Sequence, residues 1–494
     1  MLPICRSFIA GEWAAPTGAS SGTVFNPSLG EPIATVPFAG PDEVDRAVKA
    51  AHEAFPAWAA TPPSERARIM FRYRDLIERH YDEIAALISR EHGKTLAESR
   101  GDLFRGLEVV ELACGAPSLL MGELLPNIAR GIDGELTRHP LGVCVGITPF
   151  NFPAMIPLWM FPLALMAGNT FVFKPSERVP LTAIRLTELL LEAGLPKGVF
   201  QLVQGDRAAV ESLLVHPLVR AVSFVGSTPV ARQIHATATA HGKRVQANGG
   251  AKNYVVVMPD ADVDKTVEAV MNAAFGCAGE RCMAGSGMIT VGDGGAKLLP
   301  ALKEAASSMS IGRTDTDKQP DMGAVITAAH RDRVRGLVDA GERDGASLLV
   351  DGRNTKVADA PNGFYLGATI VENVKIEMAL VQEEVFGPVL NVMHMDDLDT
   401  AIEQANASSF GNGAAIFTRS GGAARKFKHE VQSGMIGINV GVPAPMAMFP
   451  FSGWNDSFFG DQHMQGRQGI YFFTQPKVAT SRWFAEGEGD IWKK

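Results

Sequence analysis

The amino-acid sequence predicts an α/β fold built on a parallel, doubly wound sheet. From Leu141 to about Asn439, apolar runs of strand length alternate with segments of helix length, and this alternation indicates repeated strand–helix–strand units. The chain has 494 residues, enough for roughly two or three domains. Hydrophobic residues make up 46% of it, and no low-complexity tract interrupts it, so we expect buried cores. Ligands bind at the carboxyl ends of the strands in such sheets, and functional residues are expected there.

Hairpins and three helices are expected before this alternation begins. Residues 8–40 combine short apolar runs with Gly and Pro, a pattern typical of β-hairpins. A helix should begin at Pro41, where acidic residues follow in the first turn, and another should run from Leu96 to Cys114. Between them, an apolar stripe at helical spacing predicts one long helix from Ser64 to about Arg90; the stripe consists of Ile69, Tyr73, Leu76, Ile77, Ile84 and Ile88.

The stretch from Leu141 to Phe173 has no charged residue, and its length raises the question of a membrane span. Prolines interrupt it four times, and Asn151 and Asn169 would need hydrogen-bond partners in lipid. We therefore predict a buried strand–turn–helix–strand unit and no association with a membrane. The N-terminus lacks a basic region followed by an apolar core, so no signal peptide is expected.

The remaining elements follow in order. We expect strands at residues 143–147, 170–173, 200–203, 221–225 and 244–247, alternating with helices at 154–166, 181–193, 208–214 and 229–240. A second α/β run should begin at Asn253–Met258 and lead through a helix ending near Phe275 to the segment Gly276–Gly285. Near the C-terminus, the aromatic run 469–474 is expected to be a strand.

Charge and cysteine content exclude several classes of protein. The net charge is −8 and no basic cluster stands out, so nucleic acid is not an expected partner. Five cysteines, an odd number in a long chain, are not typical of a disulfide framework and favour a reducing compartment, the cytoplasm. No metal site is expected.

The segment Gly276–Gly285 holds the best candidate for a nucleophile. Small residues surround Cys282, and the neighbouring Arg281 is expected to favour the reactive thiolate. The alternatives are that Cys282 is an inert buried cysteine or that Cys277 is the nucleophile. A Gly-Ser turn at Phe224–Thr228, where a strand leads into a helix, is a candidate phosphate cradle.

Five motifs together resemble the aldehyde dehydrogenase superfamily. They are Thr148-Pro149-Phe150-Asn151-Phe152-Pro153, Lys174-Pro175-Ser176-Glu177, Phe224–Thr228, Gly279–Cys282 and Glu383-Glu384-Val385-Phe386-Gly387-Pro388-Val389. The resemblance covers nearly the whole chain. It implies a Rossmann-type NAD-binding domain (1–121 and 142–250), a catalytic domain (251–465) and a β oligomerisation arm (122–141 and 466–494). It also implies a homotetramer or a homodimer.

The resemblance assigns roles to individual residues. Cys282 would attack the aldehyde, and the side-chain amide of Asn151, with the backbone N–H of Cys282, would stabilise the oxyanion. Lys174 and Glu177 would hold the adenosine ribose. The other expected NAD-binding residues are Thr148, Phe150, Gly226, Ser227, Glu384 and Phe386.

One position departs from the hydrolytic members of the superfamily. Those members carry a water-activating Glu where this chain has Asn248, in Asn248-Gly249-Gly250-Ala251-Lys252. An amide cannot accept a proton from water, whereas a thiol ionises near neutral pH without such help. The substitution therefore favours transfer of the acyl group to a thiol.

This branch resembles the methylmalonate-semialdehyde dehydrogenases, which acylate coenzyme A. The supporting runs are Asn248–Asn253, Val256–Ala261, Arg281–Ala284 and Phe104–Leu107. The resemblance implies that Arg105 and Arg281 bind the carboxylate of the semialdehyde, that the acyl group loses CO₂, and that CoA takes the product. The sequence departs from the branch at Glu280, where many members have Gln, and at Gly285, where a larger residue is common.

Two other functions are considered. One is a hydrolytic NAD-dependent dehydrogenase for another small aldehyde. The other is a non-catalytic protein that keeps the fold as a binding module, and the presence of both Cys282 and Asn151 argues against it. For Arg105 the alternative is an ordinary exposed charge on a helix.

Overall fold

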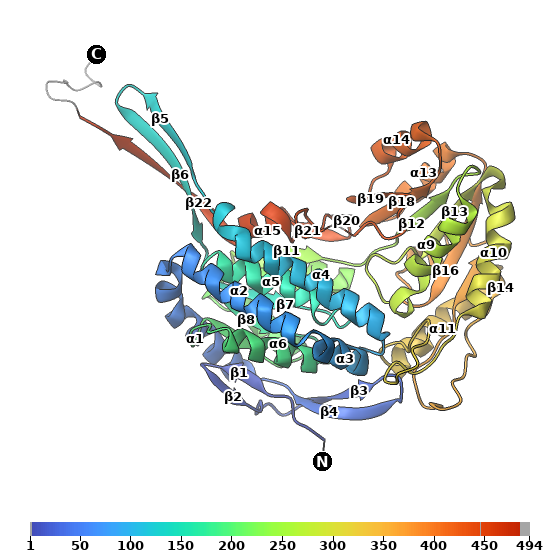
Figure 1. Ribbon diagram of the computed structural model, residues 1–494, viewed down its shortest axis with the longest axis horizontal. Helices are drawn as coiled ribbons and strands as arrows, with labels where there is room; N and C mark the ends of the chain where they lie inside the picture. Colours follow the sequence, from blue (N-terminus) through green and yellow to red (C-terminus); the bar gives the residue numbers. More distant parts are fainter. Residues whose placement is uncertain (1, 445, 485–494) are drawn as a thin grey trace.

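Two α/β bodies and a projecting three-stranded arm make up the computed structural model, which describes residues 2–444 and 446–484 (Figure 1). The first body contains an eight-stranded sheet. Its strands, in spatial order, are β2 (Glu12–Ala14), β1 (Ser7–Ile9), β9 (Phe200–Leu202), β8 (Thr170–Lys174), β7 (Val143–Ile147), β10 (Val219–Val225), β11 (Arg244–Asn248) and β21 (Phe458–Gly460). The five strands from β9 to β11 are parallel, which confirms the doubly wound sheet.

Helices cover both faces of this sheet. They are α1 (Pro41–Ala60), α2 (Pro63–Arg79), α3 (Tyr81–His92), α4 (Leu96–Gly115), α5 (Met155–Met166), α6 (Pro180–Glu192), α7 (Arg207–Val215) and α8 (Thr228–Ala240). Side chains of a strand alternate between the faces, so Phe171 and Phe173 of β8 pack with α5 and α6, whereas Val172 packs with α1 and α7. The uncharged stretch forms β7, α5 and β8 and is buried throughout these elements, as predicted. No helix in the described part of the chain has the length and apolar character needed to cross a membrane.

The second body carries the nucleophile segment. Its seven-stranded sheet has the order β14 (Ser347–Val350), β15 (Thr369–Glu372), β16 (Val389–Met395), β13 (Gly287–Val291), β12 (Tyr254–Val257), β18 (Gly413–Phe417) and β19 (Met435–Ile438), parallel except for β14. The helices are α9 (Val263–Phe275), α10 (Gly295–Ser308), α11 (Ala328–Arg343), α12 (Ala379–Gln382), α13 (Leu398–Asn406) and α14 (Gly421–Glu430).

The arm consists of β5 (Glu123–Ala129), β6 (Ile132–Pro140) and β22 (Thr474–Arg482), paired in the order β22-β6-β5. Two hairpin-like pairs complete the strands: β3 (Ser21–Asn26) with β4 (Glu31–Pro37), and β17 (Phe410–Gly411) with β20 (Trp454–Asn455). Residues 8–40 therefore form strands as expected. Residues 485–494, which we expected in the arm, lie outside the described residues.

The predicted long helix from Ser64 to about Arg90 is wrong, because the chain forms two helices that meet at His80. His80 leaves the helical conformation, with φ −104° and ψ 18°. Asp82 and Glu83 then stabilise the new N-terminus of α3, where partial positive charge collects. The apolar stripe continues across the break, so periodicity alone did not reveal it.

The predicted strand at 469–474 is also wrong. Residues Gly466–Phe472 form the helix α15, which packs against α5, and the strand β22 begins only at Thr474. Arg244 stabilises the helix end because its Nη1 donates to the carbonyl oxygens of Tyr471, Phe472 and Thr474. Burial of the aromatic run on this helix outweighs its β-propensity.

The expected domain division stays a prediction, with two refinements. The strand β21 lies within the range 251–465 but pairs with β11 of the first sheet. The helix α15 lies within the range 466–494 but packs on the first body.

Candidate active site

Cys282 lines a cavity of about 570 Å³ to which both bodies contribute. The cavity brings Cys282 together with Arg105 and Arg281, the two arginines predicted to recognise a carboxylate. Its apolar walls come mainly from Phe152, Met155, Trp159, Val442 and Phe451. The size and mixed lining suit a small organic substrate with one charged end.

The backbone before Cys282 adopts an unusual left-handed turn. Cys277, Ala278 and Gly279 have φ values of 52°, 51° and 72°, and this conformation costs roughly 1–2 kcal/mol for each residue with a side chain. A Cβ atom on Gly279 would overlap the carbonyl oxygen of Gly387, so only glycine fits here. The turn therefore packs the nucleophile segment against the Glu383–Val389 motif.

Two buried asparagines hold the backbone of the nucleophile itself. The carbonyl oxygen of Cys282 accepts a hydrogen bond from Asn253 Nδ2 at 2.9 Å and another from Asn412 Nδ2 at 3.0 Å. We did not predict either role, because the two residues lie far from Cys282 in the sequence and nothing in their spacing indicates a contact. They fix the position of the sulfur in the cavity.

The predicted oxyanion donor, Asn151, lies against the same segment. The residue is 2% exposed, and its Nδ2 donates to the carbonyl oxygen of Glu280 at 3.1 Å. An amide nitrogen has two hydrogens, so one remains for an oxyanion formed on Cys282. The bond to Glu280 orients the amide beside the nucleophile.

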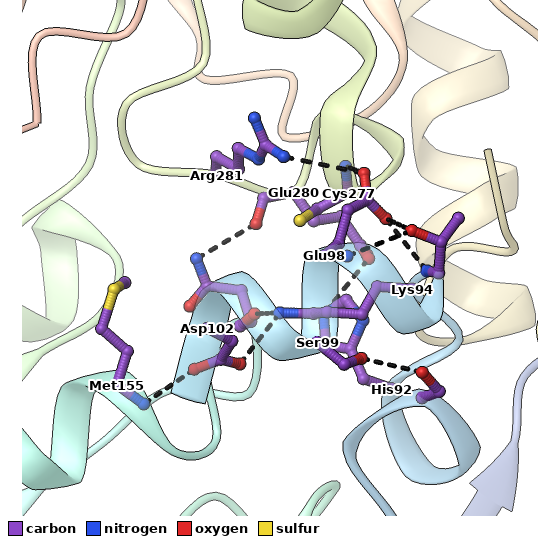
Figure 2. Close-up of polar contacts among 12 residues, drawn as sticks. His92, Lys94, Glu98, Ser99, Asp102, Met155, Cys277, Glu280 and Arg281 are labelled. Carbon is purple, nitrogen blue, oxygen red and sulfur yellow. Dashed lines mark hydrogen bonds and ion pairs between the residues drawn. The ribbon is translucent and has the colours of Figure 1, made fainter. Parts of the chain in front are cut away.

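A buried ion pair behind Asn151 holds its loop. Lys94 and Asp102 are both fully buried and 3.1 Å apart (Figure 2). Lys94 Nζ also donates to the carbonyl oxygen of Asn151 at 2.6 Å, and Asp102 Oδ1 accepts from the backbone N–H of Met155 at 2.7 Å. The pair thus fixes both ends of the Asn151–Met155 segment. Sequence reasoning missed this pair, since isolated charges eight residues apart give no signal.

The resting thiol of Cys282 is protonated: Arg281 favours the thiolate, as expected, but burial outweighs its effect. Burial raises the pKa of Cys282 to about 12, and the charge of Glu384 adds to this, while the opposing effect of Arg281 is smaller. The guanidinium of Arg281 lies instead against Gly276 and donates to the backbone and side-chain oxygens of Asn272. The nucleophile must lose a proton during the reaction.

The carboxyl ends of the first sheet place the predicted cofactor residues at one edge. The chain passes from β7 to β8 on one side and returns to β10 on the other, so the topological switch point lies between β7 and β10. Thr148 and Phe150 follow β7, and Gly226 and Ser227 follow β10. A dinucleotide binds at such a point, with its phosphates at a helix N-terminus, here that of α8.

The other predicted cofactor residues also suit a dinucleotide. Lys174 Nζ lies 3.1 Å from Glu177 Oε2. Burial alone would raise the pKa of Glu177, but the charge of Lys174 lowers it. Glu177 is therefore a carboxylate that can accept hydrogen bonds from hydroxyls. Glu384 Oε1 accepts from the backbone N–H of Ala251 at 3.0 Å, and burial raises its pKa to about 7. The rings of Phe150 and Phe386 meet edge to face at 5.8 Å.

Asn248 lies beside Gly226 at the cofactor edge. It ends β11, is 2% exposed, and its carbonyl oxygen accepts from the backbone N–H of Gly226 at 3.1 Å. Neither polar atom of its side chain has a hydrogen-bond partner among the described residues. The position that supplies the water-activating carboxylate in hydrolytic enzymes thus holds a buried amide without proton-accepting capacity.

Glu280 forms a buried titratable cluster with two histidines. Its side chain is fully buried, with Oε1 3.6 Å from His330 and Oε2 3.8 Å from His92. Burial raises the pKa of Glu280 to about 8. Burial also lowers the pKa of each histidine, so neither is a cationic partner at neutral pH. The carboxyl group is therefore neutral near pH 7.

We expect Glu280→Gln to stabilise the protein increasingly as the pH rises. The pKa of Glu280 is 4.5 when unfolded and about 8 when folded, so folding becomes less favourable between these values and the full penalty remains above pH 8. The variant lacks this penalty, which is on the order of a few kcal/mol because one pKa unit corresponds to about 1.4 kcal/mol. Unfolding temperatures measured from pH 5 to 8.5 should coincide at low pH and diverge at high pH. Unfolding temperatures that differ by the same amount at every pH would show that folding does not raise the pKa of Glu280.

Comparisons with known proteins agree with this geometry. A family model for the aldehyde dehydrogenase family matches residues 13–479. The chain is 50% identical to malonate-semialdehyde dehydrogenase 2 of Geobacillus kaustophilus over 478 residues, covering 97% of this chain and 98% of the relative. It is 48% identical to malonate-semialdehyde dehydrogenase of Halalkalibacterium halodurans over 478 residues, which again cover 97% of this chain and 98% of the relative.

Solved structures agree as well. The crystal structure of methylmalonate-semialdehyde dehydrogenase from Oceanimonas doudoroffii superimposes with a TM-score of 0.96 at 47% identity, over 99% of each chain. A Sinorhizobium meliloti protein described as a methylmalonate-semialdehyde dehydrogenase, in complex with NAD, gives a TM-score of 0.97 at 43% identity, again over 99% of each chain. On the fold, the motifs and these matches, the chain belongs to the aldehyde dehydrogenase family.

Proposed function

We propose that the protein oxidises malonate semialdehyde or methylmalonate semialdehyde with NAD and transfers the decarboxylated acyl group to CoA. The observation that carries this proposal is Asn248, a buried amide where hydrolysis requires a carboxylate. The names of the relatives and the bound NAD of one solved structure support it. The arginines in the cavity supply the charge that a semialdehyde carboxylate needs.

The first half of the reaction uses the cavity residues. Cys282 gives its thiol proton to water and its sulfur bonds to the aldehyde carbon, which places a negative charge on the former carbonyl oxygen. The second hydrogen of Asn151 Nδ2 and the backbone N–H of Cys282 donate to this oxygen, and each such donor is worth about 3 kcal/mol in the transition state. The residues named above would hold NAD at the β7–β10 edge, where it would supply the hydride acceptor. A thioester of Cys282 remains.

The second half releases the acyl group. The carboxylate β to the thioester carbonyl leaves as CO₂, its bonding electrons pass to the thioester carbonyl, and protonation of the α-carbon gives an acetyl or propionyl group. The CoA thiolate then attacks the thioester carbon and Cys282 sulfur leaves. Water competes poorly because the described site offers it no carboxylate at position 248.

We also propose that the arm mediates assembly into a homotetramer or a homodimer. Leu124, Leu125 and Ile128 on β5 and Val478 on β22 are each more than half exposed in the single chain. Apolar side chains on a projecting sheet favour contact with another copy. A cytoplasmic location fits the five cysteines, none of which forms a disulfide.

The decisive experiment follows NADH from malonate semialdehyde with and without CoA. Without CoA we expect a burst of NADH that is stoichiometric with the enzyme, followed by slow hydrolysis of the Cys282 thioester. With CoA we expect sustained turnover, and mass spectrometry should detect acetyl-CoA. Asn248→Glu should speed hydrolysis of the thioester in the absence of CoA. Full-speed turnover to a free acid without CoA would instead support the hydrolytic dehydrogenase, and no NADH under any condition would support a non-catalytic protein.

We expect Arg105→Leu to raise KM for malonate semialdehyde about tenfold or more, since charge-assisted hydrogen bonds contribute roughly 1.5–3 kcal/mol. KM for propanal, which has no carboxylate, should change far less. Steady-state kinetics with both aldehydes checks this. An equal loss for both would mean that Arg105 is structural.

A further inference from the structure

The cavity around Cys282 has no surplus of positive charge, although it is proposed to bind an anion. Its charged lining residues are Glu98, Asp102, Arg105, Glu108 and Arg281. Asp102 is compensated by Lys94 behind it. The two arginines therefore face two glutamates, and a substrate carboxylate entering the cavity must compete with carboxylates of the protein itself.

Glu98 is a fixed partner of Arg281. Its Oε2 accepts from the backbone N–H of Thr95 at 2.9 Å and from the Thr95 hydroxyl at 3.0 Å, which caps α4. Its Oε1 accepts from the backbone N–H of Cys277 and lies 3.6 Å from Arg281 (Figure 2). These bonds tie Glu98 to both the helix and the nucleophile turn. It cannot leave Arg281 without loosening that turn.

Glu108 is held much less firmly. Its Oε2 accepts one hydrogen bond, from Arg105 Nη1 at 3.0 Å, and no other partner of its side chain occurs among the described residues. The side chains of Glu108 and Arg105 are 23% and 38% exposed. A rotation of Glu108 toward water would leave Arg105 without a carboxylate partner, because partly exposed pairs of this kind contribute little stability. Only the weak acceptor Met446 Sδ, 2.8 Å from Arg105 Nη1, would remain.

We propose that Glu108 competes with the substrate carboxylate for Arg105. This competition sets the affinity and selectivity for aldehydes that carry a carboxylate. This inference rests on the proposed function. A semialdehyde carboxylate replaces Glu108 with a charge of the same sign and restores the pairing of Arg105. A neutral aldehyde cannot replace it and leaves the Arg105–Glu108 pair in place. Glu108 is thus a specificity-determining residue that touches the recognition group and not the reacting carbon.

The test is Glu108→Gln, which keeps the shape of the side chain and removes its charge. We expect the ratio of kcat/KM for malonate semialdehyde to that for propanal to rise about two- to fivefold, the factor to which the free energy of a partly exposed ion pair corresponds. The matched control is Glu111→Gln on the same helix, because Glu111 pairs with Arg74 and does not line the cavity. An unchanged or lower ratio in Glu108→Gln would overturn the proposal and make Glu108 a residue that orients Arg105.

A binding measurement separates this result from failure of the proposed function. 3-Hydroxypropionate carries the carboxylate of malonate semialdehyde but no aldehyde, and it can be tested as an inhibitor of propanal oxidation. Its inhibition constant should fall about two- to fivefold in Glu108→Gln and stay constant in Glu111→Gln. If malonate semialdehyde is not oxidised by the wild type, the proposed function fails, and the inhibition constants still decide whether Glu108 competes for Arg105. A constant that rises or does not change in Glu108→Gln contradicts the competition.

Discussion

Cys282→Ala is expected to abolish dehydrogenase activity, with a loss of roughly four orders of magnitude or more, the scale seen when a covalent nucleophile is removed. No other sulfur takes its place in the proposed geometry. Cys277 lines the same cavity, but it lies within the left-handed turn and its backbone N–H is held by Glu98. NAD binding, measured by the quenching of protein fluorescence, should be unchanged.

The comparison with Cys277→Ala decides between the two cysteines. If Cys282 is the nucleophile, Cys277→Ala should keep at least about a tenth of the wild-type kcat, since only packing in the turn changes. The NADH burst separates the two variants most clearly, because only an enzyme that forms the thioester produces it. A burst of full amplitude in Cys282→Ala would move the nucleophile elsewhere.

Lys94→Met is expected to cause the largest combined loss of stability and activity outside the nucleophile. The substitution leaves Asp102 buried without its ion-pair partner, and such a change costs about 3–5 kcal/mol. It also removes the donor to the carbonyl oxygen of Asn151, so the loop that carries the oxyanion donor loses one of its two anchors. Unfolding in urea and kcat with propanal at saturating NAD measure the two effects.

The double variant Lys94→Met with Asp102→Asn separates folding from positioning. It removes both charges of the buried pair, and the new side-chain amide oxygen at position 102 can still accept from the backbone N–H of Met155, so most of the lost stability should return. The kcat should remain low, because Asn151 still lacks its donor, while KM for NAD should stay near the wild-type value. Recovery of full kcat in the double variant would show that the ion pair serves folding alone.

Local patterns in the sequence predicted most of the architecture because they follow from backbone periodicity. The alternation after Leu141 predicted the parallel strands β7 to β11, and the uncharged stretch was correctly assigned to a buried unit, since α5 is apolar all round. The same patterns failed at His80 and at residues 469–474. At His80 the apolar stripe continues across the break and hides it, and at residues 469–474 burial of the aromatic side chains outweighs β-propensity.

The sequence by itself determined the chemistry that the site can carry: a cysteine, an amide at 151, an amide at 248 and two arginines, each identifiable by its motif. Only the tertiary structure decided how they are held and how they are charged. Burial makes Cys282 a thiol and Glu280 a neutral acid. Lys94, Asp102, Asn253 and Asn412 position the nucleophile and the oxyanion donor through contacts between residues far apart in the chain. These effects depend on distance and desolvation in three dimensions, which no spacing along the sequence encodes.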